Sequence, residues 1–212
     1  SEIYFLEKGT RGIFRLAGTR LMRLPFEISG PGRNMQLVGN KLYVVELGDL
    51  FSYGDENVIE FDLTTNTGRR LNGTDGFKGL TNIKVIDGVV KGTERMTDNV
   101  VFVDLASGKT VARKSAKPGV YGIDTFGKCA VVVSEEAKAL TFMKLSGGNV
   151  SIEGSWDLRN AGDMLKRPRS LAANSVDDHI FVRSSYVCPS CTTTQSSVWS
   201  FNDDGSMMDK CR

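Results

Sequence analysis

The segment Asn57-Val58-Ile59-Glu60-Phe61-Asp62-Leu63 returns 42 residues later as Asn99-Val100-Val101-Phe102-Val103-Asp104-Leu105. Each copy is rich in the β-branched and aromatic residues that favour strands. Each copy is also followed by a glycine, Gly68 or Gly108, of the kind that tight turns require. We therefore predict that the two segments are equivalent strands of a repeated β unit.

The same strand-and-turn unit recurs more faintly along the whole chain. In each unit one anchor residue marks the end of the recurring strand, and these anchors are Leu16, Leu63, Leu105, Leu145 and Asp203. The spacings between successive anchors are 47, 42, 40 and 58 residues. A period of 40 to 50 residues with four short strands per unit is typical of a β-propeller. We predict one all-β domain over residues 1–212, a propeller of about five four-stranded antiparallel blades; a generic β-sandwich or barrel is the alternative.

Each unit after the first has room for four strands, whereas the first has room for three. The expected strands are 3–6, 13–16 and 21–24 in the first unit; 35–38, 41–46, 58–63 and 69–71 in the second; 82–86, 89–91, 100–105 and 110–113 in the third; 121–125, 129–134, 140–145 and 151–156 in the fourth; and 170–174, 179–183, 198–202 and 207–210 in the fifth. The one short helix is expected within 158–166. Because propellers close by pairing their first and last blades, we expect a three-stranded first blade, or a missing strand supplied from beyond Arg212.

The third unit, with Asp87-Gly88-Val89-Val90-Lys91 followed by the 99–112 segment NVVFVDLASGKTVA, resembles the blades of YncE/quinoprotein-like propellers. The resemblance extends over nearly the whole chain. It implies the blade architecture and brings no catalytic residue with it.

Charge and hydropathy exclude two classes of partner. The 27 basic and 25 acidic residues give a net charge of only +2, too balanced for nucleic-acid binding, and no apolar run is long enough for membrane insertion. Four cysteines and two glycosylation sequons, at Asn72 and Asn149, favour a secreted glycoprotein.

Cys188-Pro189-Ser190-Cys191 is the most specific local motif. The Thr-rich segment after it does not predict the helix that a redox motif needs, and further zinc ligands with pair spacing are missing, so we expect a Cys188–Cys191 disulfide that staples a long loop. The states of Cys129 and Cys211 stay open; a buried free thiol is one alternative for Cys129, which lies inside an apolar strand. The single histidine, His179, is expected to be structural, and no cofactor is expected.

The long connections all fall on one expected face of the propeller, because they join the second strand to the third or one blade to the next. Long loops carry binding residues more often than short turns do. The candidate binding residues on this face are its aromatic side chains, Phe51, Tyr53, Phe77 and Tyr186. Each of them either anchors a partner or folds back to cap a blade. The basic run Lys166, Arg167 and Arg169 is expected to be solvated.

These features favour a secreted, non-enzymatic binding module that presents its loop face to a protein or glycan. Only Trp156 and Trp199 are available for stacking on sugars, and no sugar site repeats from blade to blade. The alternative is a metal-dependent lactonase or hydrolase with its site in the central channel, where Asn34 and Asn82 enter at matching positions.

Overall fold

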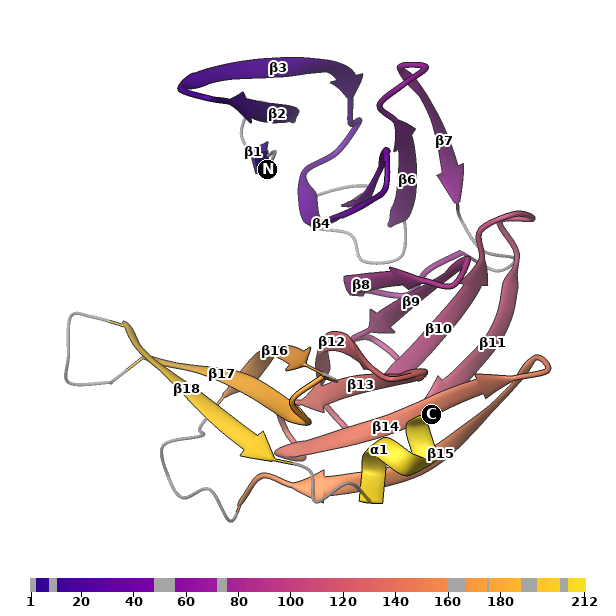
Figure 1. Cartoon of the computed structure of the whole chain (residues 1–212), viewed down its shortest axis with the longest axis vertical. Helices are drawn as coiled ribbons and strands as arrows, with labels where there is room; N and C mark the ends of the chain where they lie inside the picture. Colours follow the sequence, from indigo (N-terminus) through magenta and orange to yellow (C-terminus); the bar gives the residue numbers. More distant parts are fainter. Residues whose placement is uncertain are drawn as a thin grey trace.

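The computed structural model describes residues 3–7, 11–47, 56–71, 76–159, 167–174, 176–187, 194–202 and 206–212. Its strands form five small antiparallel sheets that follow one another around a common axis as the blades of a β-propeller (Figure 1). The predicted all-β, five-blade fold is confirmed. Within the described part, no helix is long and apolar enough to cross a membrane.

Three blades have four strands each, and the first and fifth have three. In chain order the strands are β1 (Ile3–Glu7), β2 (Gly12–Ala17) and β3 (Arg20–Glu27) in blade 1; β4 (Gly32–Val38), β5 (Lys41–Glu46), β6 (Asn57–Asp62) and β7 (Thr67–Leu71) in blade 2; β8 (Leu80–Ile86), β9 (Val89–Glu94), β10 (Asn99–Asp104) and β11 (Thr110–Ser115) in blade 3; β12 (Val120–Phe126), β13 (Cys129–Ser134), β14 (Ala139–Ser146) and β15 (Asn149–Asp157) in blade 4; and β16 (Pro168–Asn174), β17 (His179–Val187) and β18 (Thr194–Asn202) in blade 5.

The two repeated segments are β6 and β10, the third strands of blades 2 and 3. Both have the same succession of one half-buried, four buried and one half-buried residue. Each is a central strand with a blade on either side, so residues pointing to both faces are removed from water. This explains why the four buried residues of β10 are all apolar. In β6 the exception is Glu60, whose buried carboxylate is paired with Lys41 and Arg69.

Neighbouring blades are held together by four apolar cores, one between each successive pair. Residues of both faces contribute: Leu42 and Phe61 pack toward blade 1, whereas Tyr43 and Val58 pack toward blade 3. The first strand of each later blade, β4, β8, β12 or β16, is innermost, and these four strands lie against one another in sequence around the channel.

The last predicted strand, 207–210, is wrong: this segment belongs to helix α1 (Ser206–Cys211), which packs against β15 of blade 4. The segment Ser-Met-Met-Asp-Lys-Cys has no β-branched residue to favour a strand. Its Met207, Met208 and Cys211 are instead buried in the core between blades 4 and 5. Blade 5 consequently ends at β18.

The predicted three-stranded first blade is confirmed, but the expected pairing of the first and last blades is wrong. No described strand of β16–β18 pairs with a strand of β1–β3, and none of the four described cores contains residues of both blades. In Figure 1 the two blades stand on either side of an opening in the ring. Within the described ranges, blades 1 and 5 thus each have one face without a neighbouring blade.

Candidate functional site

All four innermost strands carry a β-bulge at the same place, close to the end where the long loops gather. In β12, Val120 pairs with Ser134 and Gly122 pairs with Val133, so that Tyr121 is the extra residue. The equivalent extra residues of β4, β8 and β16 are Arg33, Thr81 and Arg169. Bulges bend a strand and redirect a side chain, and they are enriched beside binding sites.

Two of these bulge residues, Tyr121 and Arg169, contact each other, and a side chain from a third blade also lies over the Tyr121 ring. The guanidinium carbon of Arg95, which follows β9 of blade 3, lies 5.5 Å from the ring centre of Tyr121 in blade 4. The guanidinium carbon of Arg169, in blade 5, lies 5.2 Å from the same ring centre. Both distances fall within the range of a cation–π interaction, so one tyrosine gathers two positive charges from the blades on either side of it.

A carboxylate completes the group. Arg169 donates from Nε to Glu135 Oε2 at 2.8 Å and from Nη2 to Glu135 Oε1 at 3.0 Å. These hydrogen bonds raise the pKa of the Arg169 guanidinium above its usual value. Arg167 Nε lies 3.7 Å from Glu135 Oε1, and its side chain is more than half exposed. Two guanidinium groups therefore share one carboxylate at the mouth of the channel, and a third, that of Arg95, lies over the Tyr121 ring.

The contacts at the mouth follow from the repeat. Arg95 and Glu135 are the first residues after the second strands of blades 3 and 4, and their backbone N–H groups bind equivalent carbonyl groups, those of Gly79 and Gly119. Each of the two side chains reaches the bulge residue of the next blade. We call Arg95, Tyr121, Glu135, Arg167 and Arg169 the mouth cluster.

Below the mouth, the channel opens into a cavity of about 250 Å³ lined by the four innermost strands. Asn34 and Asn82 line it, at the matching positions that the sequence indicates. The amide of Asn34 donates to Asn82 Oδ1 at 3.2 Å, and that of Asn82 donates to the carbonyl of Tyr121 at 2.8 Å. Both amides thus hold adjacent innermost strands together.

Polar side chains deeper in the channel also hold adjacent innermost strands together. Gln36 both donates to the Val85 carbonyl and accepts from the Val85 N–H. Lys84 Nζ lies 2.9 Å from Asp124 Oδ1, while the other carboxylate oxygen of Asp124 accepts from Ala173 N–H at 3.1 Å. Among the described residues, no group of three or more His, Cys, Asp or Glu side chains is arranged to hold a metal. The polar side chains that line the channel thus form hydrogen bonds and ion pairs between neighbouring blades.

The aromatic residues expected on the loop face fall into two groups. Phe77 is only 1% exposed and packs with the core between blades 2 and 3, so it takes the capping role and is not a surface anchor. Tyr186 lies at the loop-face end of β17, but its side chain is outside the described part. Phe51 and Tyr53 lie outside the described residues altogether.

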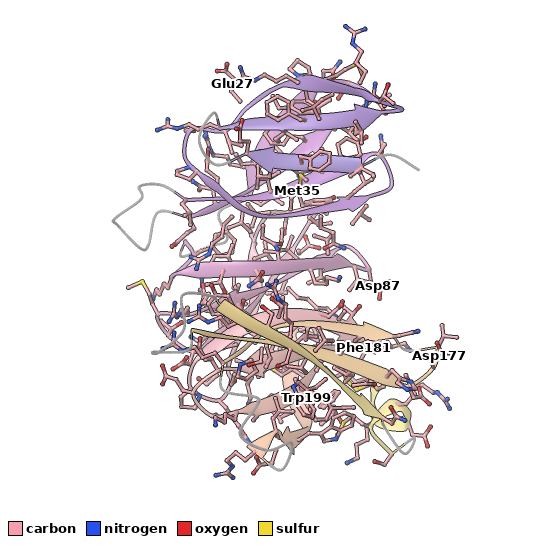
Figure 2. The ribbon with its side chains drawn as sticks, turned by 90° about the vertical axis from the view of Figure 1, so that its left-hand side faces the viewer. Glu27, Met35, Asp87, Asp177, Phe181 and Trp199 are labelled. Carbon is pink, nitrogen blue, oxygen red and sulfur yellow. A yellow bond between two sulfur atoms is a disulfide. The ribbon has the colours of Figure 1, made fainter. Side chains whose placement is uncertain are left out.

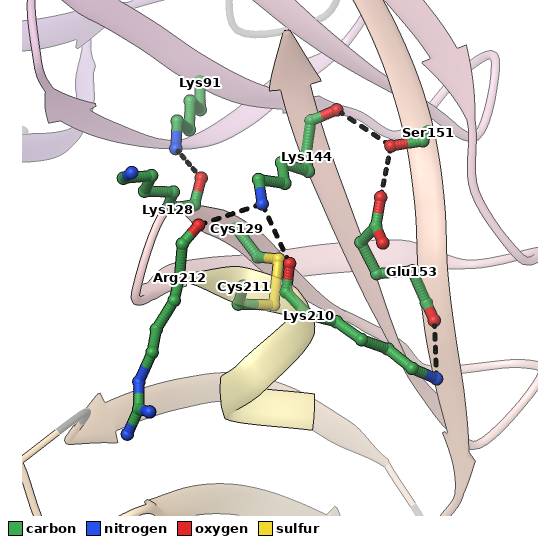
Figure 3. The surroundings of a disulfide bond; sticks show 9 residues. All are labelled: Lys91, Lys128, Cys129, Lys144, Ser151, Glu153, Lys210, Cys211 and Arg212. Carbon is green, nitrogen blue, oxygen red and sulfur yellow. Dashed lines mark hydrogen bonds between the residues drawn. A yellow bond between two sulfur atoms is a disulfide. The ribbon is translucent and has the colours of Figure 1, made fainter. Parts of the chain in front are cut away.

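The cysteine expectations are partly corrected. Cys129 is not a free thiol: it forms a disulfide with Cys211, and both residues are fully buried (Figure 3). Lys128 N–H donates to the Cys211 carbonyl, and Lys144 Nζ donates to the carbonyl oxygens of Lys210 and Arg212, each at 2.9 Å. Helix α1 is therefore fastened to blade 4 where its short turns lie. Cys188 and Cys191 lie outside the described residues.

Three further expectations concern the basic run, the two tryptophans and the histidine. The basic run 166–169 is not simply solvated, because Arg169 is two-thirds buried and paired; Lys166 lies outside the described residues. Trp156 and Trp199 are partly buried against the core between blades 4 and 5, and Trp156 packs edge-on against Phe142. His179 contacts the carbonyl of Asp177 through Nδ1 and stacks on Phe181.

Comparison with known proteins identifies the fold and no family. No family model matches the chain, and no curated protein matches it. Among solved structures, a functionally unknown protein from Desulfotomaculum acetoxidans superposes with a TM-score of 0.68 at 9% identity, over 96% of this chain and 67% of the other. A putative 6-phosphogluconolactonase from Bacteroides fragilis gives 0.62 at 10% identity, over 91% and 63%.

The computationally designed Ika8 protein superposes with a TM-score of 0.58 at 12% identity, over 84% of this chain and 54% of the design. The chain thus spans between about half and two thirds of the length of these structures. At such low identity the likeness concerns the fold alone.

Proposed function

We propose that the protein is a non-catalytic binding module whose mouth cluster, on the long-loop face, receives an anionic group of a protein or glycan partner. The observation that carries this proposal is the convergence of Arg95 and Arg169 on Tyr121 from neighbouring blades. A site assembled from three blades in the bulged, loop-bearing end of the fold is where a ligand contact is expected.

The charge of the cluster indicates the chemistry of the ligand. Arg169 already shares Glu135 with Arg167, whereas Arg95 is exposed and forms no ion pair within the described part of the chain. Guanidinium N–H groups bind carboxylates, sulfates and phosphates in a planar fork. Because Tyr121 already has two guanidinium groups over its ring, it positions cations and does not offer a platform for a sugar ring.

The alternative, a metal-dependent hydrolase in the channel, receives less support. The amides of Asn34 and Asn82 are committed to hydrogen bonds between innermost strands. The resemblance to YncE/quinoprotein-like blades likewise carries no catalytic residue. A binding role for the mouth is therefore the better proposal.

A secreted location is part of the same proposal. A buried disulfide between Cys129 and Cys211 is typical of proteins that fold in an oxidising compartment. Asn149, the asparagine of one sequon, is exposed at the start of β15, on the short-turn face. A glycan there leaves the mouth cluster on the opposite face open.

The proposal is tested with two immobilised probes, an oligo-glutamate peptide and a uronic-acid oligosaccharide, each beside its neutral counterpart. We expect one acidic probe to bind, with an affinity that falls as salt is raised. Arg95→Ala should weaken binding about five- to tenfold, the effect of losing one charged contact of about 1 to 1.4 kcal/mol.

Arg20→Ala is the matched control, since Arg20 is an exposed arginine at the short-turn end of β3. It should leave binding unchanged. Absence of binding to both acidic probes, or equal losses in the two variants, would refute the proposal.

A further inference from the structure

Blade 1 presents an exposed apolar face. Ile3, Phe5 and Leu21 are 52%, 46% and 56% exposed. The register places Ile3 beside Leu16 and Leu21, and Phe5 beside Phe14, so that all five side chains share one side of the sheet. We call these five residues the blade-1 face.

The matching positions of β5 and β6, the strands of blade 2 that correspond to β1 and β2, are buried. In blade 2, which repeats the order of blade 1, β5 contributes Leu42 and Val44 and β6 contributes Ile59 and Phe61. These residues are at most 5% exposed and form the core against the preceding blade. The blade-1 face thus has the residue types of an interblade surface, although none of the described blades packs on it.

The free face of blade 5, at the other end of the series, is different. Its register groups are Ala172 with Phe181 and Ser200, and Ser170 with Arg183 and Val198. Phe181, which Figure 2 labels, and Val198 are exposed among small and polar neighbours. A polar outer surface is what terminal units of repeat proteins use to face water. Head-to-tail stacking of blade 1 on blade 5 of another copy would therefore bury serine and arginine side chains against apolar ones.

We propose that the blade-1 face is a self-association surface, on which the blade-1 face of a second copy packs about a two-fold axis. Such an isologous contact opposes two identical apolar sheet faces, the arrangement of a β-sandwich. It continues the series of apolar contacts between blades by which this chain is built.

The rim of the face is compatible with pairing to itself. Arg23 shares the register group of Phe5 and Phe14, and Glu7 and Glu27 share the next group along the sheet. Because both signs of charge border the apolar residues, a two-fold axis does not force a single sign of charge against itself.

The test is the mass of the full chain in solution, measured by light scattering and sedimentation between about 1 and 200 μM. We expect a dimer. Phe5→Glu should raise the dissociation constant at least thirtyfold, because it buries two like charges across the axis. Leu21→Ser should weaken the dimer too, and since Leu21 is largely exposed it should leave the melting temperature of the monomer unchanged.

Val198→Glu, on the exposed face of blade 5, is the matched control and should leave the dimer intact. A wild-type monomer throughout this range would overturn the proposal. A dimer that survives Phe5→Glu, or one that Val198→Glu dissociates, would overturn it as well, because the contact would then lie elsewhere.

Discussion

Arg169 of blade 5 lies over the ring of Tyr121 in blade 4 and, through two hydrogen bonds, also holds Glu135 of that blade. At the opposite, short-turn end of the same pair of blades, the Cys129–Cys211 disulfide fastens the helix that follows blade 5 to β13 of blade 4. Among the described strands, blade 5 has a neighbouring blade on one side only. Its attachment to blade 4 is reinforced at both ends of the channel axis.

The Arg169–Glu135 pair is expected to contribute measurably to stability. The two side chains are 33% and 15% exposed, so solvent screens them only in part. In a double-mutant cycle of Arg169→Ala and Glu135→Ala, we expect a coupling free energy of about 1 to 2 kcal/mol by urea unfolding. The exposed Arg159–Asp157 pair provides the comparison and should give a clearly smaller coupling free energy, because solvent screens it.

Reduction of the Cys129–Cys211 disulfide should destabilise the protein strongly. The bridge spans 82 residues, and cross-linking a chain segment of that length lowers the entropy of the unfolded state by the equivalent of about 4 to 5 kcal/mol. The Cys129→Ala/Cys211→Ala variant should therefore melt on the order of 10 °C lower, as followed by circular dichroism.

The Cys188→Ala/Cys191→Ala variant separates this effect from that of the predicted loop disulfide. It should respond to a reducing agent as the wild type does, since the 129–211 bridge remains. If the melting temperature of Cys129→Ala/Cys211→Ala matched that of the wild type, the bridge would have no part in stability.

Gly122 is expected to tolerate no side chain. A Cβ atom there would lie 2.6 Å from the Arg169 carbonyl oxygen and 3.1 Å from the Cα atom of Ser170, both backbone atoms of the neighbouring innermost strand. Gly122→Ala should cost about 2 kcal/mol or more, because β12 and β16 must separate. At Gly68 the nearest atoms belong to the Phe61 ring, which can move, so Gly68→Ala should cost less; equal losses in chemical denaturation would contradict this explanation.

Because of Tyr43, we expect the folded protein to lose stability at alkaline pH. Its burial, together with a hydrogen bond to Glu60, raises its pKa from 10.0 to about 12. The folded state therefore favours the neutral phenol, a contribution that is complete below pH 10 and is lost as the pH rises toward 12.

The unfolding free energies of the wild type and Tyr43→Phe, measured at pH 9 and 11.5, test this. The wild type should lose more than the variant, by at most about 3 kcal/mol. Lysines titrate in both proteins, so the difference isolates the tyrosine. Identical losses would show that Tyr43 ionises as readily in the folded state as in the unfolded one.

The repeat allowed the fold to be predicted because the apolar residues of short sequence segments reflect the packing between blades. The matched segments at 57–63 and 99–105 became β6 and β10, since a central blade strand needs apolar residues on both faces. The same reasoning gave a wrong prediction for the C-terminal segment 207–210. Met207 and Met208 fit a strand by hydropathy, but their burial against blade 4 and the bond at Cys211 depend on contacts that no local pattern expresses.

The mouth cluster was missed for a related reason. Arg95 and Glu135 are 40 residues apart, as are Thr81 and Tyr121, so an alignment of the units would have placed each pair at an equivalent position. That Arg95 and Arg169 converge on one ring depends on the angle between blades and on the bulges, neither of which hydropathy encodes. The role of Phe77 was ambiguous because an aromatic residue that anchors a partner and one that caps a core occur in loops of the same amino-acid composition.

The span of the disulfide also bears on the order in which the chain matures. During synthesis β12–β15 are complete by Asp157, more than 50 residues before Cys211 is made. Cys129 must therefore wait as a reduced thiol while Cys188 and Cys191 emerge from the ribosome ahead of its native partner. Its burial in the finished protein involves blade 5 and helix α1, so blade 4 alone does not shield it from these earlier cysteines, and the native pairing is completed only when the tail packs on blade 4.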